Sequence, residues 1–367
     1  MKLSSYAQGR DNNFNLLRLL AAFAVLFSHS FIVAIGKDAV EPLYTSLGVT
    51  LGSIAVDIFF VTSGFLVTAS LLARKNTVEF VLSRILRIYP ALFLMVLISV
   101  FVFGVAFTSQ PVGVFLHDDV THLFAIKNVT LIFGVTGNLP GVFESTPYPK
   151  VVNASLWTLP FEIRMYGILA IIWLALYLLG RFREKLFASL VVLMAFGALF
   201  IHFRDYFLSH EVDNFHRLFF MFFTGASYYV LKEWIVLSHK AFFLTVILVL
   251  FSAFYSKDTF FVIYHATVAY ITFWVAYVPK GSVRRFNRLG DYSYGVYIYA
   301  FPVQQSVAAL MPGVTVGTLM MISFVYTFAL AFISWHLVEK RALKLKSAGI
   351  FLSRRAVSNS LPIRRHL

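Results

Sequence analysis

The stretch NLLRLLAAFAVLFSHSFIVAI, residues 15–35, decides the class of this protein. A helix needs about 20 mostly apolar residues to cross a hydrocarbon core of roughly 30 Å, and this stretch supplies them. It follows a polar segment and lacks a small-residue cleavage site, so we expect a retained span and not a removed signal peptide. The stretch therefore predicts a first membrane span, with two ionisable residues inside it, Arg18 and His29.

The composition of all 367 residues agrees with a membrane protein. Apolar residues make up 59% and charged residues 13%, whereas soluble domains are nearer half and a quarter. The net charge is +14, but the basic residues fall in the gaps between apolar runs and do not gather on one soluble face, so we expect no nucleic-acid partner. The absence of cysteine excludes disulfides, thiolate metal sites and a cysteine nucleophile, and we expect no metal site.

Further apolar runs of similar length predict an all-α, polytopic membrane bundle of about ten transmembrane helices within residues 1–340. The apolar patch at 123–135 is left out of this count because Lys127 and Asn128 interrupt it. The predicted spans are 15–35, 52–73, 88–107, 158–180, 186–203, 217–231, 241–256, 259–278, 292–311 and 317–338.

Basic residues set the predicted orientation, because they are retained on the cytoplasmic side of membranes. With the N-terminus inside, most of the lysines and arginines fall on the inner side, and an even number of spans places both termini in the cytoplasm. We expect the outer loop 108–157 to be functional and the basic tail 341–367 to be cytoplasmic. The outer segments contain only Lys37, Lys127, Lys150, Arg204, Arg217 and Lys257.

Ionisable residues inside spans indicate function, because burying them in lipid is costly. Counted along their spans, His29, Asp57, Glu162 and His265 fall at a similar depth near the outer side. A carboxylate there could orient the His29 imidazole and raise its basicity, with Asp57 and Glu162 as the candidates. For His265 we favour a structural hydrogen bond between helices.

Arginines gather at the inner side. Arg18 lies about 20° from His29 around the helix and about 16 Å from it along the axis. Arg84 and Arg87 are three residues apart on one helical face. Three converging guanidinium groups would suit a phosphorylated ligand, although plain topological anchoring explains each of them equally well. The pattern fits an enzyme with a phosphorylated cytoplasmic donor. It also fits a proton-coupled transporter or a flippase of a lipid-linked sugar, but the sequence shows no internal repeat of the kind common in transporters.

The chain resembles the acyltransferase-3 family of integral membrane O-acyltransferases along nearly its whole length. An arginine and a histidine separated by ten residues, Arg18 and His29, are the most specific mark of this resemblance. Ala300 departs from the pattern, because many members have a histidine there, and Ile163 replaces a common second acidic residue. The chain looks like the stand-alone type, without an appended hydrolase-like domain. The other matching segments are VDIFFVTSGFLV, Arg84 with Arg87, SLWTLPFEIRMY, LGDYSYGVYIYAFPVQQ and WHLVEKRAL.

The resemblance implies transfer of an acyl group, usually acetyl from acetyl-CoA, to a hydroxyl of a cell-surface glycan in a bacterial inner membrane. O-antigen, exopolysaccharide and similar acceptors stay open, as do succinyl or longer acyl donors. The expected partners are acyl-CoA, a glycan or lipid-linked glycan, and membrane lipids, with no permanently bound cofactor. Within that expectation Arg18, Arg84 and Arg87 would hold the CoA phosphates, and His29 would be a general base or carry the acyl group.

The remaining candidate residues surround this reaction path. Trp157 would stack on an acceptor sugar, and Tyr297, Tyr299 and Gln304 would line the path. Four residues are expected to be structural, with the small pair allowing close helix packing. They are Ser63, Gly64, Pro90 and Pro302.

Overall fold

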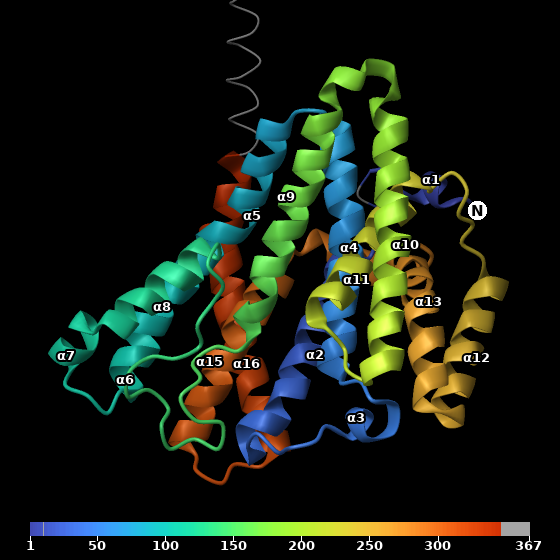
Figure 1. Cartoon of the computed structure of the whole chain (residues 1–367). Helices are drawn as coiled ribbons and strands as arrows, with labels where there is room; N and C mark the ends of the chain where they lie inside the picture. Colours follow the sequence, from blue (N-terminus) through green and yellow to red (C-terminus); the bar gives the residue numbers. More distant parts are fainter. Residues whose placement is uncertain (10, 346–367) are drawn as a thin grey trace, which may run out of the picture.

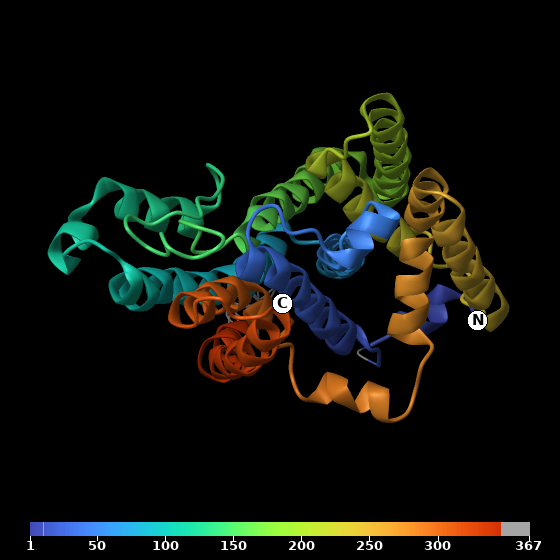
Figure 2. The ribbon, with the colours of Figure 1, turned by 90° about the horizontal axis from the view of Figure 1, so that it is seen from below.

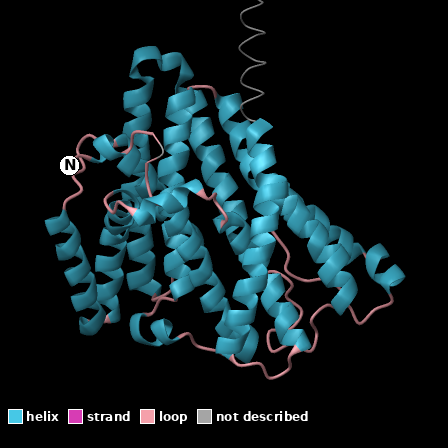
Figure 3. Ribbon diagram, turned by 180° about the vertical axis from the view of Figure 1, so that it is seen from behind, coloured by secondary structure: helices cyan, strands magenta, loops and turns pink. Residues whose placement is uncertain are grey.

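Helices make up almost all of the ordered backbone (Figure 1). The computed structural model describes residues 1–9 and 11–345, so Arg10 and most of the predicted basic tail lie outside the described residues. Within the described part no strand occurs, only three isolated bridges, and the ribbon is helix and loop throughout (Figure 3). The all-α expectation is therefore confirmed.

Six helical stretches among the described residues are long and apolar enough to cross a membrane. Three of them are single helices: α2 (Phe14–Ile35), α4 (Leu51–Arg74) and α13 (Lys257–Tyr277). The other three continue through irregular turns. They are Thr77–Phe107 (α5, η1 and α6), Ser155–Ser209 (η2, α9, η3 and α10) and Val316–Leu345, which contains α16 and η5.

The predicted count of ten spans is not established by these six stretches, and it stays a prediction. The stretch Ser155–Ser209 contains two of the predicted spans, because α9 (Leu159–Ala175) and α10 (Arg183–Ser209) are joined through Gly180, whose backbone is not helical. The other three predicted spans form helices that are shorter or more polar. They are α11 (Asn214–Val230), α12 (His239–Tyr255) and α15 (Ser293–Leu310).

The helix that contains the third predicted span, 88–107, begins well before residue 88. Helix α5 (Thr77–Ile98) starts at Asn76, whose side chain accepts hydrogen bonds from the backbone N–H groups of Val78 and Glu79. That cap satisfies N–H groups that the first helical turn leaves open. The helix then continues through Pro90 and the π-helical turn η1 (Ser99–Gly104) to α6 (Val105–Phe107). Arg84 and Arg87 therefore lie on the helix itself and not in the connection before it.

Helices α2 and α4 pack against each other in the middle of the bundle (Figure 2), and α15 and α16 (Val316–Ser334) pack on α2. Helix α11 covers α4 at very close range. A Cβ atom at Gly64 would lie 1.9 Å from the Phe222 carbonyl oxygen, and one at Gly225 would lie 1.9 Å from that of Val61. Only glycine fits at such distances, so the packing role expected for Gly64 agrees with the structure.

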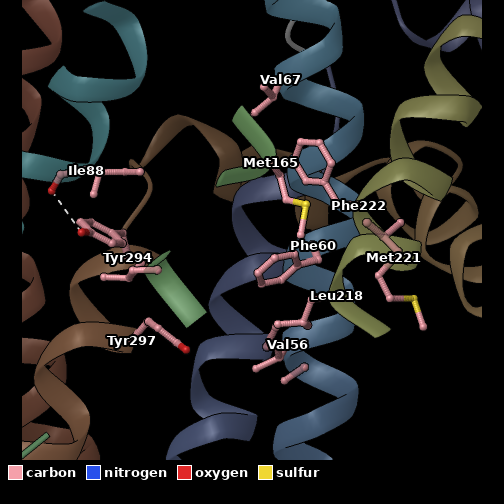
Figure 4. Close-up of a cluster of buried hydrophobic side chains, with 14 of the residues drawn as sticks. Val56, Phe60, Val67, Ile88, Met165, Leu218, Met221, Phe222, Tyr294 and Tyr297 are labelled. Atoms are coloured by element: carbon pink, nitrogen blue, oxygen red, sulfur yellow. Dashed lines mark hydrogen bonds between the residues drawn. The ribbon is translucent and has the colours of Figure 1, made fainter. Parts of the chain in front are cut away.

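The core lies where α4, α5, α9, α11 and α15 meet (Figure 4). Aliphatic, aromatic and methionine side chains fill it, and Tyr294 satisfies its hydroxyl by donating to the Ile88 carbonyl oxygen at 3.1 Å. The side chains labelled in this core are Val56, Phe60, Val67, Ile88, Met165, Leu218, Met221, Phe222, Tyr294 and Tyr297.

The connections at the predicted outer end carry short helices. The loop 108–157 contains α7 (Val112–His117) and α8 (Asp119–Thr130), which project to one side of the bundle (Figure 2). The 36–50 connection contains α3 (Pro42–Leu47). At the opposite end lie α1 (Leu3–Tyr6), α14 (Ser282–Arg285) and η4 (Phe286–Arg288).

Candidate active site

A cavity of about 520 Å³ opens between the 36–50 connection and the ends of α2 and α4. We call it the outer cavity. Its wall is mostly apolar but also presents an imidazole, a buried carboxylate, a hydroxyl, a guanidinium and two aromatic rings, a combination suited to a ligand that carries hydroxyl groups. Those residues are His29, Glu41, Ser53, Arg217, Trp157 and Tyr297.

His29 lies in this wall and is half-buried. Its ring packs edge-on against Phe301, with the ring centroids 5.1 Å apart. Its Nδ1 atom is buried and has no hydrogen-bond partner among the described residues. Since buried polar atoms are nearly always hydrogen-bonded, an imidazole left open beside a cavity is positioned to bind a ligand group.

The expected contact between His29 and Glu162 is absent. Glu162 accepts hydrogen bonds from Ser63 Oγ at 3.1 Å and from the Tyr166 hydroxyl, and makes none to His29. It lines a second cavity of about 30 Å³, which we call the inner cavity and which has room for little more than a water molecule. The two residues share a depth in the sequence, but the carboxylate of Glu162 bonds to α4 and to its own helix and lines the inner cavity with Arg18, not the outer cavity with His29. Ser63, expected to serve packing alone, is a partner of Glu162.

Asp57 also belongs to a different site. Its carboxylate accepts a hydrogen bond from the Tyr264 hydroxyl at 2.9 Å and pairs with Arg217 Nε at 3.6 Å. It lines a third cavity, of about 690 Å³, between α4, α11 and α13, which also contains His265. Asp57 thus faces α11 and α13, and the single outer layer expected from the sequence is divided between separate cavities.

His265 forms the hydrogen bond between helices that we favoured for it. Its Nε2 lies 3.0 Å from His202 Nε2 on α10, and its Nδ1 lies 2.7 Å from the Phe261 carbonyl oxygen on its own helix. Both nitrogens are thereby occupied, so this histidine is held by the packing of α10 on α13.

Two of the three expected arginines converge at the inner end. Arg18 Nη1 lies 3.1 Å from Asp291 Oδ2, and Arg87 Nη2 lies 2.5 Å from the same oxygen. Arg87 Nη1 is also 3.7 Å from Glu339 Oε2, whose other oxygen accepts from Ser334 Oγ. We call Arg18, Arg87, Asp291 and Glu339 the inner ion-pair cluster. Within it each guanidinium group lies close to a carboxylate, so neither of them is free for a phosphate.

Arg84 does not join this cluster. Its guanidinium lies 5.9 Å from the centre of the Tyr166 ring and 6.0 Å from that of Phe80, and its Nε donates to Ser83 Oγ. Among the described residues Arg84 forms no ion pair with Asp291 or Glu339, so only two of the three expected arginines share these carboxylates. Residues three apart on a helix differ by about 60° in direction, enough for Arg84 to face α9 while Arg87 faces α15 and η5 (Trp335–Glu339).

Asp291 lies in the connection before α15 and holds the cluster together. Burial raises the pKa of its carboxyl, but the charges of Arg87 and Arg18 and the hydrogen bonds from Ser293 outweigh burial and lower the pKa to about 2. Its carboxylate therefore stays ionised at any physiological pH. This pinning of α2 and α5 to the start of α15 is the strongest electrostatic constraint at the inner end.

The four residues expected along the acceptor path divide into two pairs. Trp157 and Tyr297 line the outer cavity. Tyr299 and Gln304 are buried elsewhere, and Gln304 Nε2 donates to the Leu26 carbonyl oxygen and to Ser30 Oγ, both at 2.8 Å. Gln304 therefore ties α15 to α2 and does not face the cavity.

Tyr297 separates the two cavities, because it lines both the outer cavity of His29 and the inner cavity of Arg18 and Glu162. Its hydroxyl donates to the Ser155 carbonyl oxygen at 2.8 Å and lies 2.6 Å from Thr158 Oγ1. Tyr297 and Val56, which line both cavities, therefore lie between the arginine level of α2 and the histidine level.

Sequence reasoning missed three residues of these sites. Asp291 stands inside the quoted segment LGDYSYG, and an acidic residue between an apolar span and a basic loop is a signal that could have identified it. Arg217 was placed in an outer connection, as was Arg204, but both lie on helices, and Arg217 is 7% exposed. Glu41 gives no signal in the sequence. It is 4% exposed, binds Ser28 Oγ and accepts from the Leu51 N–H at 2.7 Å.

Comparisons with known proteins place this geometry in context. The family described as "Acyltransferase domain", acyltransferase 3, matches residues 11–336. The chain is 31% identical over 363 residues to an O-acetyl transferase of Shigella phage Sf6, covering 94% of this chain and 99% of that protein. It is 27% identical over 375 residues to nodulation protein 10 of Rhizobium leguminosarum bv. viciae, covering 94% and 96%. A putative peptidoglycan O-acetyltransferase of Bacillus subtilis (strain 168) is 33% identical over 39% of this chain and 22% of its own. No solved structure matches.

Proposed function

The chain belongs to the acyltransferase-3 family, and on that premise we propose that it is a membrane O-acyltransferase that uses a cytoplasmic acyl-CoA, most simply acetyl-CoA, to acylate a hydroxyl of a cell-surface glycan. His29 is the central residue of this proposal. The observation that carries it is an imidazole whose buried Nδ1 has no hydrogen-bond partner among the described residues, at the wall of a cavity large enough for a sugar unit.

The chemistry requires a base and an accessible thioester. In the proposed step the acceptor hydroxyl gives its proton to the His29 imidazole while its oxygen attacks the thioester carbonyl. The carbon–sulfur bond then breaks, and the leaving thiolate takes up a proton to give free CoA. If His29 carries the acyl group instead, one imidazole nitrogen attacks first and the acceptor hydroxyl attacks the acyl-imidazole in a second step. Both routes need the thioester to reach His29 from the arginine level, past Tyr297.

Several side chains have proposed supporting roles. Trp157 lines the outer cavity and offers a ring face for a sugar. Arg217 lines the same cavity and offers a donor to acceptor oxygens while it pairs with Asp57. Glu162 and Asp57 would act indirectly, through the residues that they bind, because neither contacts His29.

The test is CoA-thiol release by the purified protein in detergent, given acetyl-CoA together with a hydroxyl acceptor such as O-antigen or exopolysaccharide fragments. We expect release that depends on acceptor, and transfer of the acetyl group to the glycan by mass spectrometry. Succinyl-CoA and a longer acyl-CoA, run in parallel, decide the acyl length. If the protein binds none of these acyl-CoA donors, the proposal is overturned and the transporter hypothesis is favoured.

We also propose that both termini face the cytoplasm, with the outer cavity on the opposite side of a bacterial inner membrane. The support is the gathering of basic residues at one end of the bundle. The chain has no native cysteine, so single cysteines at Asp38 and Ser282 give clean reporters. A membrane-impermeant maleimide should label Asp38→Cys and spare Ser282→Cys in spheroplasts, and the reverse pattern would contradict the orientation.

A further inference from the structure

A basic pocket of about 450 Å³ lies at the inner end of the bundle, on the connection between α13 and α15. Four cations and one carboxylate line it. We call it the basic pocket. Its residues are Asp11, Lys280, Arg284, Arg285, Asn287 and Arg288.

One of the four cations is part of the framework. Arg284 Nη1 pairs with Asp11 Oδ2 at 2.6 Å, and its Nη2 donates to the carbonyl oxygens of Tyr277 and Pro279. These bonds fix the end of α13 and the turn that follows it. Because Asp11, the one carboxylate of the pocket, pairs with Arg284, it does not neutralise the remaining cations.

The side chains of the other three cations have no polar partner in the described part of the chain. For the side chains of Lys280, Arg285 and Arg288, no ion pair or hydrogen bond occurs within residues 1–9 and 11–345. The contrast with the inner ion-pair cluster is sharp, because Arg18 and Arg87 are matched by Asp291 and Glu339. A phosphate dianion needs unmatched cations, and guanidinium groups bind its oxygens in pairs.

The loop of the basic pocket is hydrogen-bonded to the first turn of α2, the helix that carries Arg18 and His29. Asn15, on the first turn of α2, donates from Nδ2 to the carbonyl oxygens of Asn287 at 3.3 Å and Gly290 at 3.1 Å. Arg18 follows Asn15 by three residues, or about 4.5 Å along the helix. His29 lies 14 residues beyond Asn15, or about 21 Å along the axis. A ligand anchored at this pocket therefore begins one helical turn before the arginine level of α2.

We propose that the basic pocket binds the phosphate groups at the nucleotide end of the acyl-CoA donor, with Arg285 and Arg288 contacting phosphate directly. This inference rests on the proposed function. It reassigns the phosphate-binding task from Arg18, Arg84 and Arg87 to a loop whose charges are free. The thioester arm then extends inward along α2. Anionic lipid headgroups present the same phosphate chemistry, so the experiment has to separate the two sources.

The experiment measures binding of CoA and of dephospho-CoA, which lacks the 3′-phosphate, by calorimetry in detergent free of anionic lipid. Arg285→Gln and Arg288→Gln should each weaken CoA binding by about tenfold, the effect of losing one charge-assisted contact. At least one of them should weaken dephospho-CoA binding much less. The matched control is Arg181→Gln with Lys185→Gln, which removes two charges from the α9–α10 connection at the same end and should leave CoA binding unchanged.

Each result has one meaning. If the wild type binds CoA and the Arg285→Gln/Arg288→Gln protein binds it equally well, the inference is overturned while the proposed function stands. If the double variant binds CoA normally but is no longer stabilised against heat by phosphatidylglycerol in nanodiscs, the pocket binds lipid headgroups instead. If the wild type binds neither CoA nor acetyl-CoA, the proposed function itself fails. Arg288→Lys keeps the charge and should retain most of the affinity, which separates phosphate binding from a folding defect.

Discussion

The inner ion-pair cluster and the outer cavity differ in how their central groups are partnered. In the cluster, Arg18 pairs with Asp291, and Arg87 pairs with Asp291 and Glu339, by contacts between four segments of the chain. In the outer cavity, the Nδ1 atom of His29 is buried with no hydrogen-bond partner among the described residues. Removing one member of a matched buried pair is strongly destabilising, whereas an unmatched buried group costs stability and is kept where a ligand completes it. The comparison separates a region that holds the helices from a region available for chemistry.

The largest effect should come from His29→Ala. Loss of a general base costs about 10²- to 10⁴-fold in rate, and thermal stability should change little because no hydrogen bond of Nδ1 is lost. Initial rates of acetyl transfer and melting curves measure both. The control is His117→Ala on the exposed helix α7, which should transfer at the wild-type rate. Substantial transfer by His29→Ala would remove the outer cavity from the mechanism.

The next largest effect should come from Asp291→Ala, and it should be a loss of stability. The change leaves two partly buried guanidinium groups facing each other, and breaking such a pair costs about 3–5 kcal/mol. Melting in detergent, followed by intrinsic fluorescence, measures it, and Arg87→Ala should cost a similar amount by stranding Glu339 as well. If Asp291→Ala melts like the wild type but loses CoA affinity, the cluster is a ligand site, and the comparison breaks.

A smaller effect is expected for Glu162→Gln. Glutamine keeps an oxygen that accepts from Ser63 and Tyr166, and Glu162 does not contact His29. The rate should fall by less than tenfold, which corresponds to a rise of less than about 1.4 kcal/mol in the activation free energy. A loss of a hundredfold or more at unchanged stability would place Glu162 in the chemistry of the outer cavity and sharpen the boundary between the two regions.

The smallest effect concerns pH. Since the folded-state pKa of Asp291 is about 2, below its ordinary 3.8, its contribution to stability is complete above the ordinary value and disappears as the pH falls toward 2. The difference in melting temperature between the wild type and Asp291→Asn should therefore shrink as the pH falls from about 4 toward 2. A difference that is unchanged over this range would show that the charge of Asp291 contributes nothing to stability.

Much of the fold was readable from local sequence. The predicted spans 15–35, 52–73 and 259–278 agree within two residues with α2, α4 and α13, because hydropathy and helical period are properties of neighbouring residues. The helix that contains the third predicted span begins at Thr77, 11 residues before that span, because Asn76 caps its first turn. The same local reasoning found His29 and Trp157, which both line the outer cavity.

Side-chain partners were beyond the sequence. Depth along a helix follows from counting, but the direction of a side chain depends on how each helix is rotated and tilted against its neighbours. Counting residues along the spans placed Asp57 and Glu162 at the depth of His29. The rotation of their helices instead directs Asp57 toward α11 and Glu162 toward α4.

The sequence by itself determined a helical membrane protein, the approximate limits of its helices, its motifs, and an arginine and a histidine on one face of α2. Only the tertiary structure decided that Arg18 is neutralised by Asp291, 273 residues away, and Arg87 by the same residue, 204 away. It also decided that Lys280, Arg285 and Arg288, which form no ion pair among the described residues, line one pocket. The reason is physical: hydropathy acts locally along the chain, whereas charge is balanced between groups that only packing brings together.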